Sequence, residues 1–376
     1  MCWCYSNNAL FTENNNGRLH KNIIMKLIKT VDAEGAVLCH DITQIIKGVT
    51  KDAVFRKGHV VTKEDIPVLL SVGKDQLYVW EKEEGMLHEN DGAEILCAMC
   101  KGEHMERSQA KEGKIELTAA CDGLLKVDNK GLKAVNGFGQ MMIATRHGNF
   151  AVKKGDKLAG TRIIPLVIEE EKMTKAKEAA MAATGNKPIL NLLPFKHKKV
   201  GIVTTGNEVF YGRIKDTFTP VIEGKLAEFD TEIIDHVTWN DDDTKVTASI
   251  LDMIHNGADI VVCTGGMSVD PDDKTPLAIK NTGADIVSYG APVLPGAMFM
   301  LAYYQVTEGE NPRTVAIMGL PGCVMYAKRT IFDLVLPRVM ADDKVTAEEL
   351  AALGLGGLCL NCPVCTFPNC GFGKGV

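Results

Sequence analysis

A glycine turn, Thr264-Gly265-Gly266-Met267-Ser268, is the first feature of this 376-residue chain that could do chemistry. It directly follows Ile260-Val261-Val262-Cys263, an uninterrupted apolar run that is typical of a strand buried on both faces. Two glycines let backbone N–H groups approach an anion closely, and the hydroxyls of Thr264 and Ser268 could add donors. The pattern predicts a phosphate-binding turn at a strand end, although a plain tight turn would have the same sequence.

Three acidic residues follow this turn or the preceding buried strand in the sequence. Asp273 follows it within Asp270-Pro271-Asp272-Asp273, while Glu208 and Asp216 follow a second buried strand. If the two strands are neighbours, the acids converge on the edge of the sheet that carries the glycine turn. Carboxylates beside a phosphate normally hold Mg²⁺, which takes one or two of them. We therefore predict Asp273, Glu208 and Asp216 as catalytic residues and Asp273 and Glu208 as metal ligands; helix capping is the alternative role.

Regular alternation of strands and helices surrounds these residues. We expect strands at 199–204, 231–236 and 259–263, with helices at 219–229 and 244–255. Alternation with helices of this length implies βαβ units and a mainly parallel sheet. The prediction is a three-layer α/β domain over residues 196–342, followed by a helix and a Cys-rich tail at 343–376.

The region before this domain is predicted to be smaller, mixed and β-rich, over residues 25–195. Alternating, Gly-punctuated segments at 81–165 indicate antiparallel strands, and an Ala/Lys-rich helix at 174–184 precedes a loop to Pro194. An earlier helix should begin after Thr62 and end at Gly73.

Residues 1–24 are polar and Asn-rich and lack the apolar core of a secretory signal, so we expect a disordered leader, or a true start at Met25.

Three segments together resemble a known family. They are Val203-Thr204-Thr205-Gly206-Asn207-Glu208, then Thr264–Val269, then Gly319-Leu320-Pro321-Gly322. They look like the signature segments of the molybdopterin-binding domain shared by molybdopterin molybdenumtransferases and molybdopterin adenylyltransferases. The resemblance covers residues 198–341. Within it, Pro271–Pro276 is closer to the adenylyltransferases, whereas Ser268-Val269 and Gly319–Gly322 are closer to the molybdenum-inserting branch.

The resemblance assigns roles to individual residues. Asp273 would lie at the metal or at bound molybdate, and Glu208 matches the acid of the first segment. Asp241 matches an acidic position of the inserting enzymes, or else caps a helix. Asn207 and Cys323-Val324 depart from the family, which usually has Asp and Asn-Pro there. The residues implied to contact the pterin and its phosphate are Thr264, Gly265, Gly266, Ser268, Gly206, Pro321 and Gly322.

The activity implied by the resemblance is Mg²⁺-dependent insertion of molybdate into adenylylated molybdopterin. Adenylyl transfer to molybdopterin, a non-catalytic carrier or sensor role, and binding of another phosphorylated small molecule stay open. Positioning and charge neutralisation would do most of the catalysis, so no protein nucleophile is required. Cys263 is better explained as a buried strand residue than as a sulfur donor. The resemblance also implies a homo-oligomer, and a molybdoenzyme is a candidate partner.

Four cysteines near the end of the chain form a second candidate site. Their spacing is Cys359-x-x-Cys362-x-x-Cys365-x-x-x-x-Cys370. Four thiolates can complete the coordination shell of one metal centre, and the spacing predicts either a [4Fe–4S] cluster or Zn²⁺. A solvated, reduced tail is the alternative.

A weaker zinc candidate is Cys97-x-x-Cys100 with His104 and Cys121, for which nothing in the sequence fixes a fourth ligand.

Bulk composition narrows the function classes. The chain is 45% hydrophobic and 24% charged, and no apolar run approaches the roughly 20 residues of a membrane span. The net charge is −6 and the lysines are scattered, so we expect neither membrane nor nucleic acid as a partner. Twelve cysteines without an export signal indicate reduced thiols and a cytoplasmic protein.

Overall fold

The computed structural model describes residues 26–46, 50–79, 85–268, 270, 273–307 and 312–375. The predicted leader at 1–24, Val269 and Pro271-Asp272 lie outside the described residues. The chain divides into two compact units between Met86 and Leu87, within the short strand β5 (Met86–His88). In the described part of the chain, every helix is too short or too polar to cross a lipid bilayer.

The first unit has two small antiparallel ladders around a compact apolar core that includes Leu38, Ile42, Leu69 and Leu77. The helix predicted between Thr62 and Gly73 is shorter at both ends than expected: it begins at Asp65, whose carboxylate accepts a hydrogen bond from the Thr62 hydroxyl, and it ends at Ser71. The elements are β1 (Lys26–Lys29), η1 (Thr30–Asp32), β2 (Ile42–Ile46), β3 (Thr50–Phe55), α1 (Asp65–Ser71) and β4 (Gln76–Val79).

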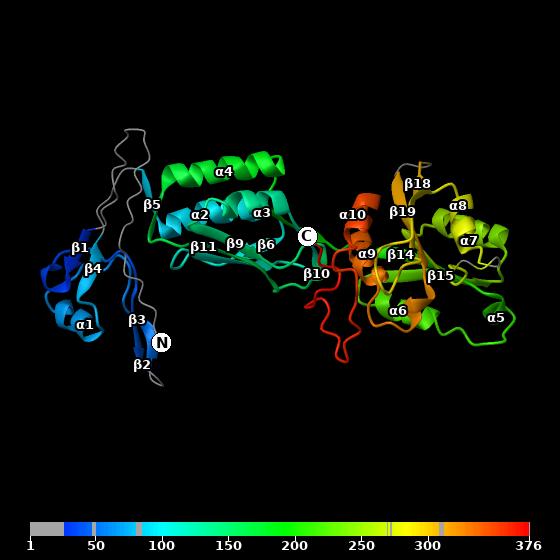
Figure 1. Ribbon diagram of the computed structural model, residues 1–376, viewed down its shortest axis with the longest axis horizontal. Helices are drawn as coiled ribbons and strands as arrows, with labels where there is room; N and C mark the ends of the chain where they lie inside the picture. Colours follow the sequence, from blue (N-terminus) through cyan, green and yellow to red (C-terminus); the bar gives the residue numbers. More distant parts are fainter. Residues whose placement is uncertain are drawn as a thin grey trace. The chain divides into compact units, whose positions relative to one another are not determined.

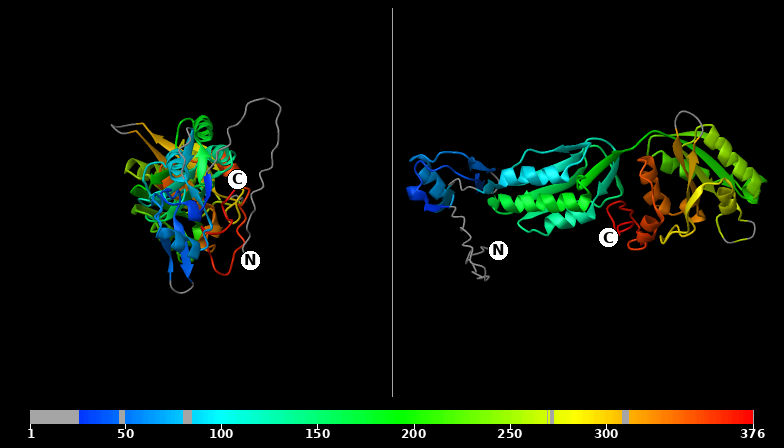
Figure 2. Two further views of the ribbon diagram at one scale, coloured as in Figure 1. Left: turned by 90° about the vertical axis from the view of Figure 1, so that its left-hand side faces the viewer. Right: turned by 90° about the horizontal axis from the view of Figure 1, so that it is seen from above.

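The second unit opens with the antiparallel strands predicted for 81–165, in the sheet orders β6-β7-β11-β9 and β10-β8-β13. Three helices lie together beside them (Figures 1 and 2). The strands are β6 (Met105–Arg107), β7 (Lys114–Ala119), β8 (Gly123–Val127), β9 (Met141–Thr145), β10 (Phe150–Val152), β11 (Lys157–Ile163), β12 (Val167–Glu169) and β13 (Leu190–Pro194). The helices are α2 (Glu89–Cys100), α3 (Asn129–Asn136) and α4 (Glu170–Thr184).

Two sequence expectations for this region are wrong. Residues 190–194 are strand β13, paired with β8, and not part of a loop. The helix α2 was missed because its first turn contains Asn90, Asp91 and Gly92, which are poor helix formers. The helix begins there because the His88 ring accepts a hydrogen bond from the Asn90 N–H.

The rest of the second unit is built on a six-stranded sheet in the order β15-β14-β16-β19-β18-β17. β14, β15, β16 and β19 are mutually parallel, and β18 is antiparallel to both β19 and β17. The predicted mainly parallel sheet is therefore confirmed. The strands are β14 (Lys198–Thr205), β15 (Thr231–Trp239), β16 (Ile260–Thr264), β17 (Asp285–Tyr289), β18 (Met300–Val306) and β19 (Arg313–Leu320).

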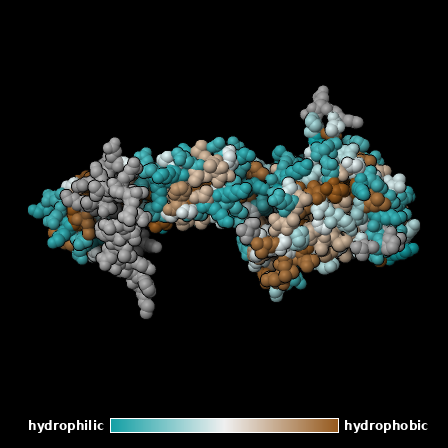
Figure 3. All heavy atoms as spheres, turned by 45° about the horizontal axis from the view of Figure 1, so that its top comes forward, coloured by the Kyte–Doolittle hydropathy of each residue, from teal (hydrophilic) through white to brown (hydrophobic). Residues whose placement is uncertain are grey.

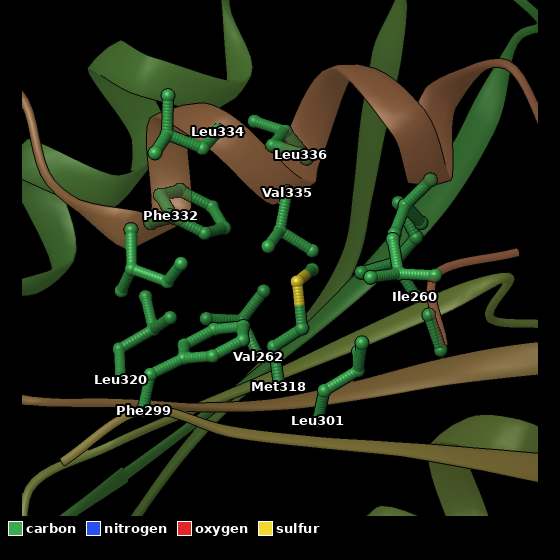
Figure 4. Packing of buried hydrophobic residues seen from close by; sticks show 14 of the residues in the cluster. Ile260, Val262, Phe299, Leu301, Met318, Leu320, Phe332, Leu334, Val335 and Leu336 are labelled. Atoms are coloured by element: carbon green, nitrogen blue, oxygen red, sulfur yellow. The ribbon is translucent and has the colours of Figure 1, made fainter. Parts of the chain in front are cut away.

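Helices cover both faces of this sheet, which makes three layers. Along β16, Ile260 and Val262 belong to one hydrophobic cluster and Val261 and Cys263 to the other, because successive strand residues face opposite sides. The first face packs against α6 (Thr219–Leu226) and α9 (Ile331–Met340), and the second against α7 (Asp243–His255) and α8 (Thr275–Asn281). Figure 4 shows Phe332 and Val335 of α9 pointing toward the strands.

A buried ion pair ties the two helices of the first face together. The Lys225 ammonium of α6 lies 2.7 Å from a carboxylate oxygen of Asp333 in α9, and these side chains are 10% and 3% exposed. Arg329 donates to the same carboxylate at 2.9 Å. Asp333 also accepts the N–H of Thr330, whose hydroxyl caps α9. The Asp333 carboxylate therefore both caps the start of α9 and holds α6 against it.

The segment after residue 342 packs into the same core. Arg338 donates to Glu349, which lies in α10 (Ala347–Ala352), at 2.9 Å and to Asp343 at 2.5 Å. Leu350 and Phe372 are buried members of the cluster that covers the first face. The hydrophobic core on the first face of the sheet thus continues past the end of α9 and includes residues as far along the chain as Phe372.

Replacing Asp333 should destabilise this unit strongly. Asp333→Ala leaves Lys225 buried beside no carboxylate and removes a helix cap, so we expect a loss of about 3–5 kcal/mol in the free energy of unfolding. Urea titration followed by circular dichroism measures it. The control is Lys153→Met, which breaks an exposed pair with Asp122 and should leave the unfolding free energy nearly unchanged. Equal effects from the two variants would contradict the structural role of Asp333.

Candidate functional site

The carboxyl edge of the six-stranded sheet is where β14, β15, β16 and β19 all end. Register places Thr264 of β16 between Thr204 of β14 and Leu320 of β19. Thr205 of β14 is in turn paired with Trp239 of β15. The segments that follow these strands therefore emerge side by side, and they include the three segments singled out in the sequence. The two strands that precede Glu208 and the glycine turn are neighbours, which is the condition that the sequence argument required.

The glycine turn is pressed against the end of β14. Gly265 has φ +83°, and a Cβ atom added there would lie 2.1 Å from the carbonyl oxygen of Thr205. Gly266 has φ +54°, and its added Cβ would lie 2.8 Å from the hydroxyl oxygen of Thr275 at the start of α8. Both positions need glycine for their backbone conformation and for the lack of space. The turn is thus fixed by contact with two other elements.

Successive backbone donors of this turn have no acceptor among the residues that the structure describes. Among the described residues, the N–H groups of Gly265, Gly266, Met267 and Ser268 make no hydrogen bond to the protein. The carbonyl groups of Gly266 and Met267, in contrast, accept from the Thr275 N–H and the Tyr289 hydroxyl. A run of unpaired N–H groups in a turn is an arrangement that binds anions.

The hydroxyl of Thr264 does not belong to that set of donors. Thr264 is 0% exposed, and its hydroxyl donates to Thr204 at 3.3 Å. The Thr204 hydroxyl lies 3.0 Å from the His236 ring nitrogen Nε2, and Thr205 and Thr275 share a hydrogen bond of 3.0 Å. These hydroxyls join the strand ends to each other and to α8. The expectation that the Thr264 hydroxyl faces a ligand is wrong, whereas Ser268 is exposed.

Glu208 and Asp241 both lie at the carboxyl edge. Glu208 is exposed on the short helix α5 (Asn207–Phe210), and its carboxylate lies over Gly206. The Asp241 carboxylate accepts the Asn207 N–H at 3.3 Å. The neighbouring Asp242, not Asp241, caps α7 by accepting two N–H groups. The sequence left open whether Asp241 is a site residue or the cap of α7, and the cap of α7 is Asp242.

Asp273 lies close to Tyr289, a residue that the sequence did not single out. Burial raises the pKa of Tyr289, and the negative charge of Asp273 raises it further. The Tyr289 hydroxyl donates to the Met267 carbonyl at 3.2 Å. Because β17 is antiparallel to β18, and β18 to β19, β17 points the same way as β19 and ends at the carboxyl edge. Only the long-range strand order brings Tyr289 here.

Asp216 is used to build the start of α6. Its carboxylate accepts the N–H of Phe218 at 2.8 Å and both the N–H and hydroxyl of Thr219, at 3.1 and 2.6 Å. Burial alone would raise the pKa of Asp216, but these hydrogen bonds outweigh it and lower the pKa. Across the described ranges, no group of three or more His, Cys, Asp or Glu side chains is arranged to hold a metal ion. The three predicted acids thus do not form a preassembled cage.

Pro321 and Gly322 open the loop after β19. Pro321 is buried, and Gly322 is exposed and begins the 3₁₀ turn η2 (Gly322–Met325). Cys323 lies within that turn, and burial raises the pKa of its thiol. An exposed glycine at a strand end leaves room for a ligand on this side of the carboxyl edge.

Three cysteines considered in the sequence are core residues. Burial raises the pKa of Cys263 to about 12, which supports its interpretation as a buried strand residue. Cys97 and Cys100 lie in the buried face of α2, and burial raises the pKa of Cys100 to about 12. Among the described residues these cysteines do not join two or more further side chains in a group that could hold a metal ion, so the weaker zinc candidate is not supported.

The fold and the turn define a domain of a recognisable class: an open α/β sheet with glycine-lined loops at the carboxyl ends of its strands, where such sheets bind small ligands. Residues 201–341 match the family described as "Probable molybdopterin binding domain", and this part of the chain is a domain of that family. Residues 27–81 match a family described only as a domain of unknown function.

Curated relatives share only short stretches with this chain. A "CinA-like protein" of Mycobacterium tuberculosis is 34% identical over 77 residues, which are 20% of this chain and 18% of the relative. A "CinA-like protein" of Syntrophus aciditrophicus is 39% identical over 83 residues, 22% of this chain and 19% of the relative. The matched stretches therefore span less than a fifth of these relatives.

Solved structures with a similar part include the "tungsten cofactor synthesizing protein MoaB" from Pyrococcus furiosus, with 21% identity and a TM-score of 0.29. The match covers 39% of this chain and 89% of that one. The "protein CinA with unknown function" from Thermoplasma acidophilum has 16% identity and a TM-score of 0.31, covering 38% and 98%.

The contact of Gly265 with Thr205 can be tested with a matched pair of glycines. Gly265 and Gly283 have φ +83° and +80°, but a Cβ at Gly283 would meet nothing within 4 Å. Gly283→Ala should cost about 1 kcal/mol of unfolding free energy from backbone strain alone. Gly265→Ala should cost about 1–3 kcal/mol more, because the methyl group overlaps Thr205. Thermal and urea unfolding measure both, and equal losses would show that the close approach is absent in solution.

Asp216→Ala should weaken the start of α6 in a pH-dependent way. Loss of a capping carboxylate costs about 1 kcal/mol at neutral pH. Because the folded-state pKa of Asp216 is lowered, its contribution is present above the unfolded-state pKa and is lost as pH falls through the folded value. The difference in unfolding free energy between variant and parent should therefore shrink in acid. Urea titrations at several pH values measure it; a difference that grows in acid would contradict the cited hydrogen bonds.

Proposed function

We propose that the α/β domain binds molybdopterin at the carboxyl edge and acts in molybdenum cofactor assembly. The observation that carries the proposal is the run of unpaired N–H groups in the glycine turn, held in place by the contact of Gly265 with Thr205. Membership of residues 201–341 in the molybdopterin-binding family supports the choice of ligand. A phosphate is the part of the ligand that these donors would bind.

Other parts of the ligand would lie along the neighbouring loops. The Ser268 hydroxyl is exposed and would add a donor to the phosphate. Gly206 and Gly322, at the ends of β14 and β19, would flank the pterin, with Pro321 behind Gly322. Thr264 would support the turn from within the sheet through its hydrogen bond to Thr204.

The reaction that we propose is Mg²⁺-dependent insertion of molybdate into adenylylated molybdopterin. Asp273 and Glu208 would hold Mg²⁺, which would neutralise charge on phosphate and molybdate oxygens. The donor set fits, because Mg²⁺ takes one or two protein carboxylates and fills its shell with water and phosphate oxygens. Asp216, whose oxygens are engaged by Phe218 and Thr219, would act by positioning α6. No nucleophile from the chain is needed.

Partners and location follow from the same proposal. We expect a cytoplasmic protein that assembles as a homo-oligomer and passes its product to a molybdoenzyme. Size-exclusion chromatography with light scattering reports the oligomeric state.

One incubation separates the proposed reaction from its alternatives. Purified full-length protein is given molybdopterin, ATP, Mg²⁺ and molybdate, with adenylylated molybdopterin in a parallel sample, and the products are separated by mass. Metallated pterin supports insertion. Adenylylated pterin without metallation assigns adenylyl transfer instead, and bound but unchanged pterin assigns a carrier or sensor. If mass spectrometry shows that the purified protein carries a different phosphorylated molecule, the proposal that its ligand is molybdopterin is overturned.

Substitution of the two metal-binding acids should separate binding from turnover. Asp273→Asn and Glu208→Gln should lower the rate of metallation by at least about tenfold, since even residues behind metal ligands have effects of that size. Affinity for the pterin should change less, because the turn provides most of the phosphate donors. Asp285→Asn and Glu223→Gln are the controls, since both residues are exposed and lie outside the carboxyl edge. Unchanged metallation in the first pair would remove these acids from the mechanism.

A further inference from the structure

The four cysteines at 359–370, the cysteine loop, all line one cavity. The cavity has a volume of about 500 Å³ and is bounded on its other side by Tyr326, Lys328 and Arg329. Cys359 and Cys370 are half-buried and pack against the core of the α/β sheet, whereas Cys362 and Cys365 are exposed. All four are free thiols. Four cysteines that are spread over 12 positions of the chain thus line one open cavity.

Few backbone hydrogen bonds hold the cysteine loop between its two ends, although Phe367 packs against the core and Lys328 donates to the carbonyls of Cys362 and Pro363. The Cys359 N–H donates to the Leu294 carbonyl at 2.8 Å, and Phe372, just beyond the loop, is 4% exposed. Between these anchors the described chain forms no helix or strand. The backbone hydrogen bond recorded within the loop runs from the Asn369 N–H to the Thr366 carbonyl. A segment of this kind needs another source of stability to keep one conformation.

The loop also exposes apolar side chains that a packed segment would bury. Leu360 and Val364 are 79% and 76% exposed, and Leu358 beside them is 63% exposed. Figure 3 shows hydrophobic side chains gathered on the surface at the lower side of the α/β part. A hydrophobic core of its own therefore does not stabilise the loop. Metal ions and disulfides are the cross-links that small segments use instead.

Lys328 and Arg329 both line the cavity, but Arg329 is ion-paired with Asp333 and Glu228. The Lys328 ammonium donates to the Pro363 carbonyl at 2.8 Å and to the Cys362 carbonyl at 3.5 Å, between the second and third cysteines. The Arg329 guanidinium lies 5.2 Å from the centre of the Phe367 ring. Four thiolates around a doubly charged centre leave a net charge of about −2. The Lys328 ammonium favours such a charge, as charged groups outside the ligands commonly do.

We propose that Cys359, Cys362, Cys365 and Cys370 together bind one metal centre through four thiolates, either Zn²⁺ or a [4Fe–4S] cluster. Within the described residues the side chains are not preassembled as a metal site, so binding draws the loop closed. Exposed Cys362 and Cys365 move toward the half-buried pair, and each thiol gives its proton to solvent as it becomes a ligand. This site is separate from the carboxyl edge and does not rest on the proposed pterin chemistry.

Metal analysis of the full-length chain tests the proposal directly. The protein is purified without oxygen, and metals are measured by mass spectrometry together with acid-labile sulfide and visible absorption. We expect about one zinc per chain without sulfide, or about four irons and four sulfides with broad visible absorption. Either result supports the site and identifies its metal. Less than about 0.1 metal per chain, even after reconstitution with Zn²⁺ or with iron and sulfide, overturns it.

Variants show whether these thiols are the ligands. Cys362→Ser with Cys365→Ser should lower metal content at least about tenfold. Val364→Ser changes an exposed residue of the same loop, and Cys121→Ser removes a thiol elsewhere; neither should alter the metal content. Metal retained in the double variant, or disulfides among the four cysteines in the purified parent, overturns the proposal.

Thiol alkylation of the unchanged protein gives an answer that does not depend on whether the variants fold. The four tail cysteines should resist the alkylating reagent until a chelator removes the metal, and should then react. Equal reaction before and after the chelator means that no metal protects them, which contradicts the proposal.

Discussion

The carboxyl edge depends on one close approach, that of Gly265 to the carbonyl oxygen of Thr205. No Cβ atom fits between the two strand ends, and the positive φ of Gly265 turns the chain immediately after β16. The direction of the following N–H groups is set by this turn. A side chain at Gly265 would force β14 and β16 apart at the end where their loops must lie together. The geometry of the site therefore depends on the absence of a side chain at Gly265 as much as on any functional group.

The rigidity behind this edge comes from the layer of helices on one face of the sheet. Asp333 joins α6 to α9 through Lys225 in a nearly water-free contact, so neither helix can shift without exposing a charge. Threonine hydroxyls connect the strand ends above it, from Thr204 to Thr264 and from Thr205 to Thr275. With the strands fixed in this way, the loops can keep donors unpaired for a ligand, which is how loops on a rigid scaffold commonly carry function.

The sequence was sufficient for the parallel strands β14, β15 and β16, because β14 and β16 contain the apolar runs Val200–Val203 and Ile260–Cys263 and are followed by glycines. The sequence placed Glu208 at the same edge as the glycine turn only on the condition that β14 and β16 are neighbours, a pairing that the structure supplies. Thr264 was misjudged because position in a strand, not residue type, decides direction: it shares the face of Ile260 and Val262, which points into the core. Tyr289 could not be found, because its place depends on two antiparallel pairings between distant segments. Local pattern carries no information about such pairings.

The contacts of Arg338 show that the α/β domain continues past the end of the family match. The family match stops at residue 341, yet Arg338, 6% exposed, finds its carboxylates at Asp343 and Glu349. A fragment cut at the family boundary would keep the guanidinium and lose both partners, and the hydrophobic face under Leu350 and Phe372 would meet water. An expression fragment of this domain therefore has to include the chain through Phe372, and homology alone would misplace its C-terminal end.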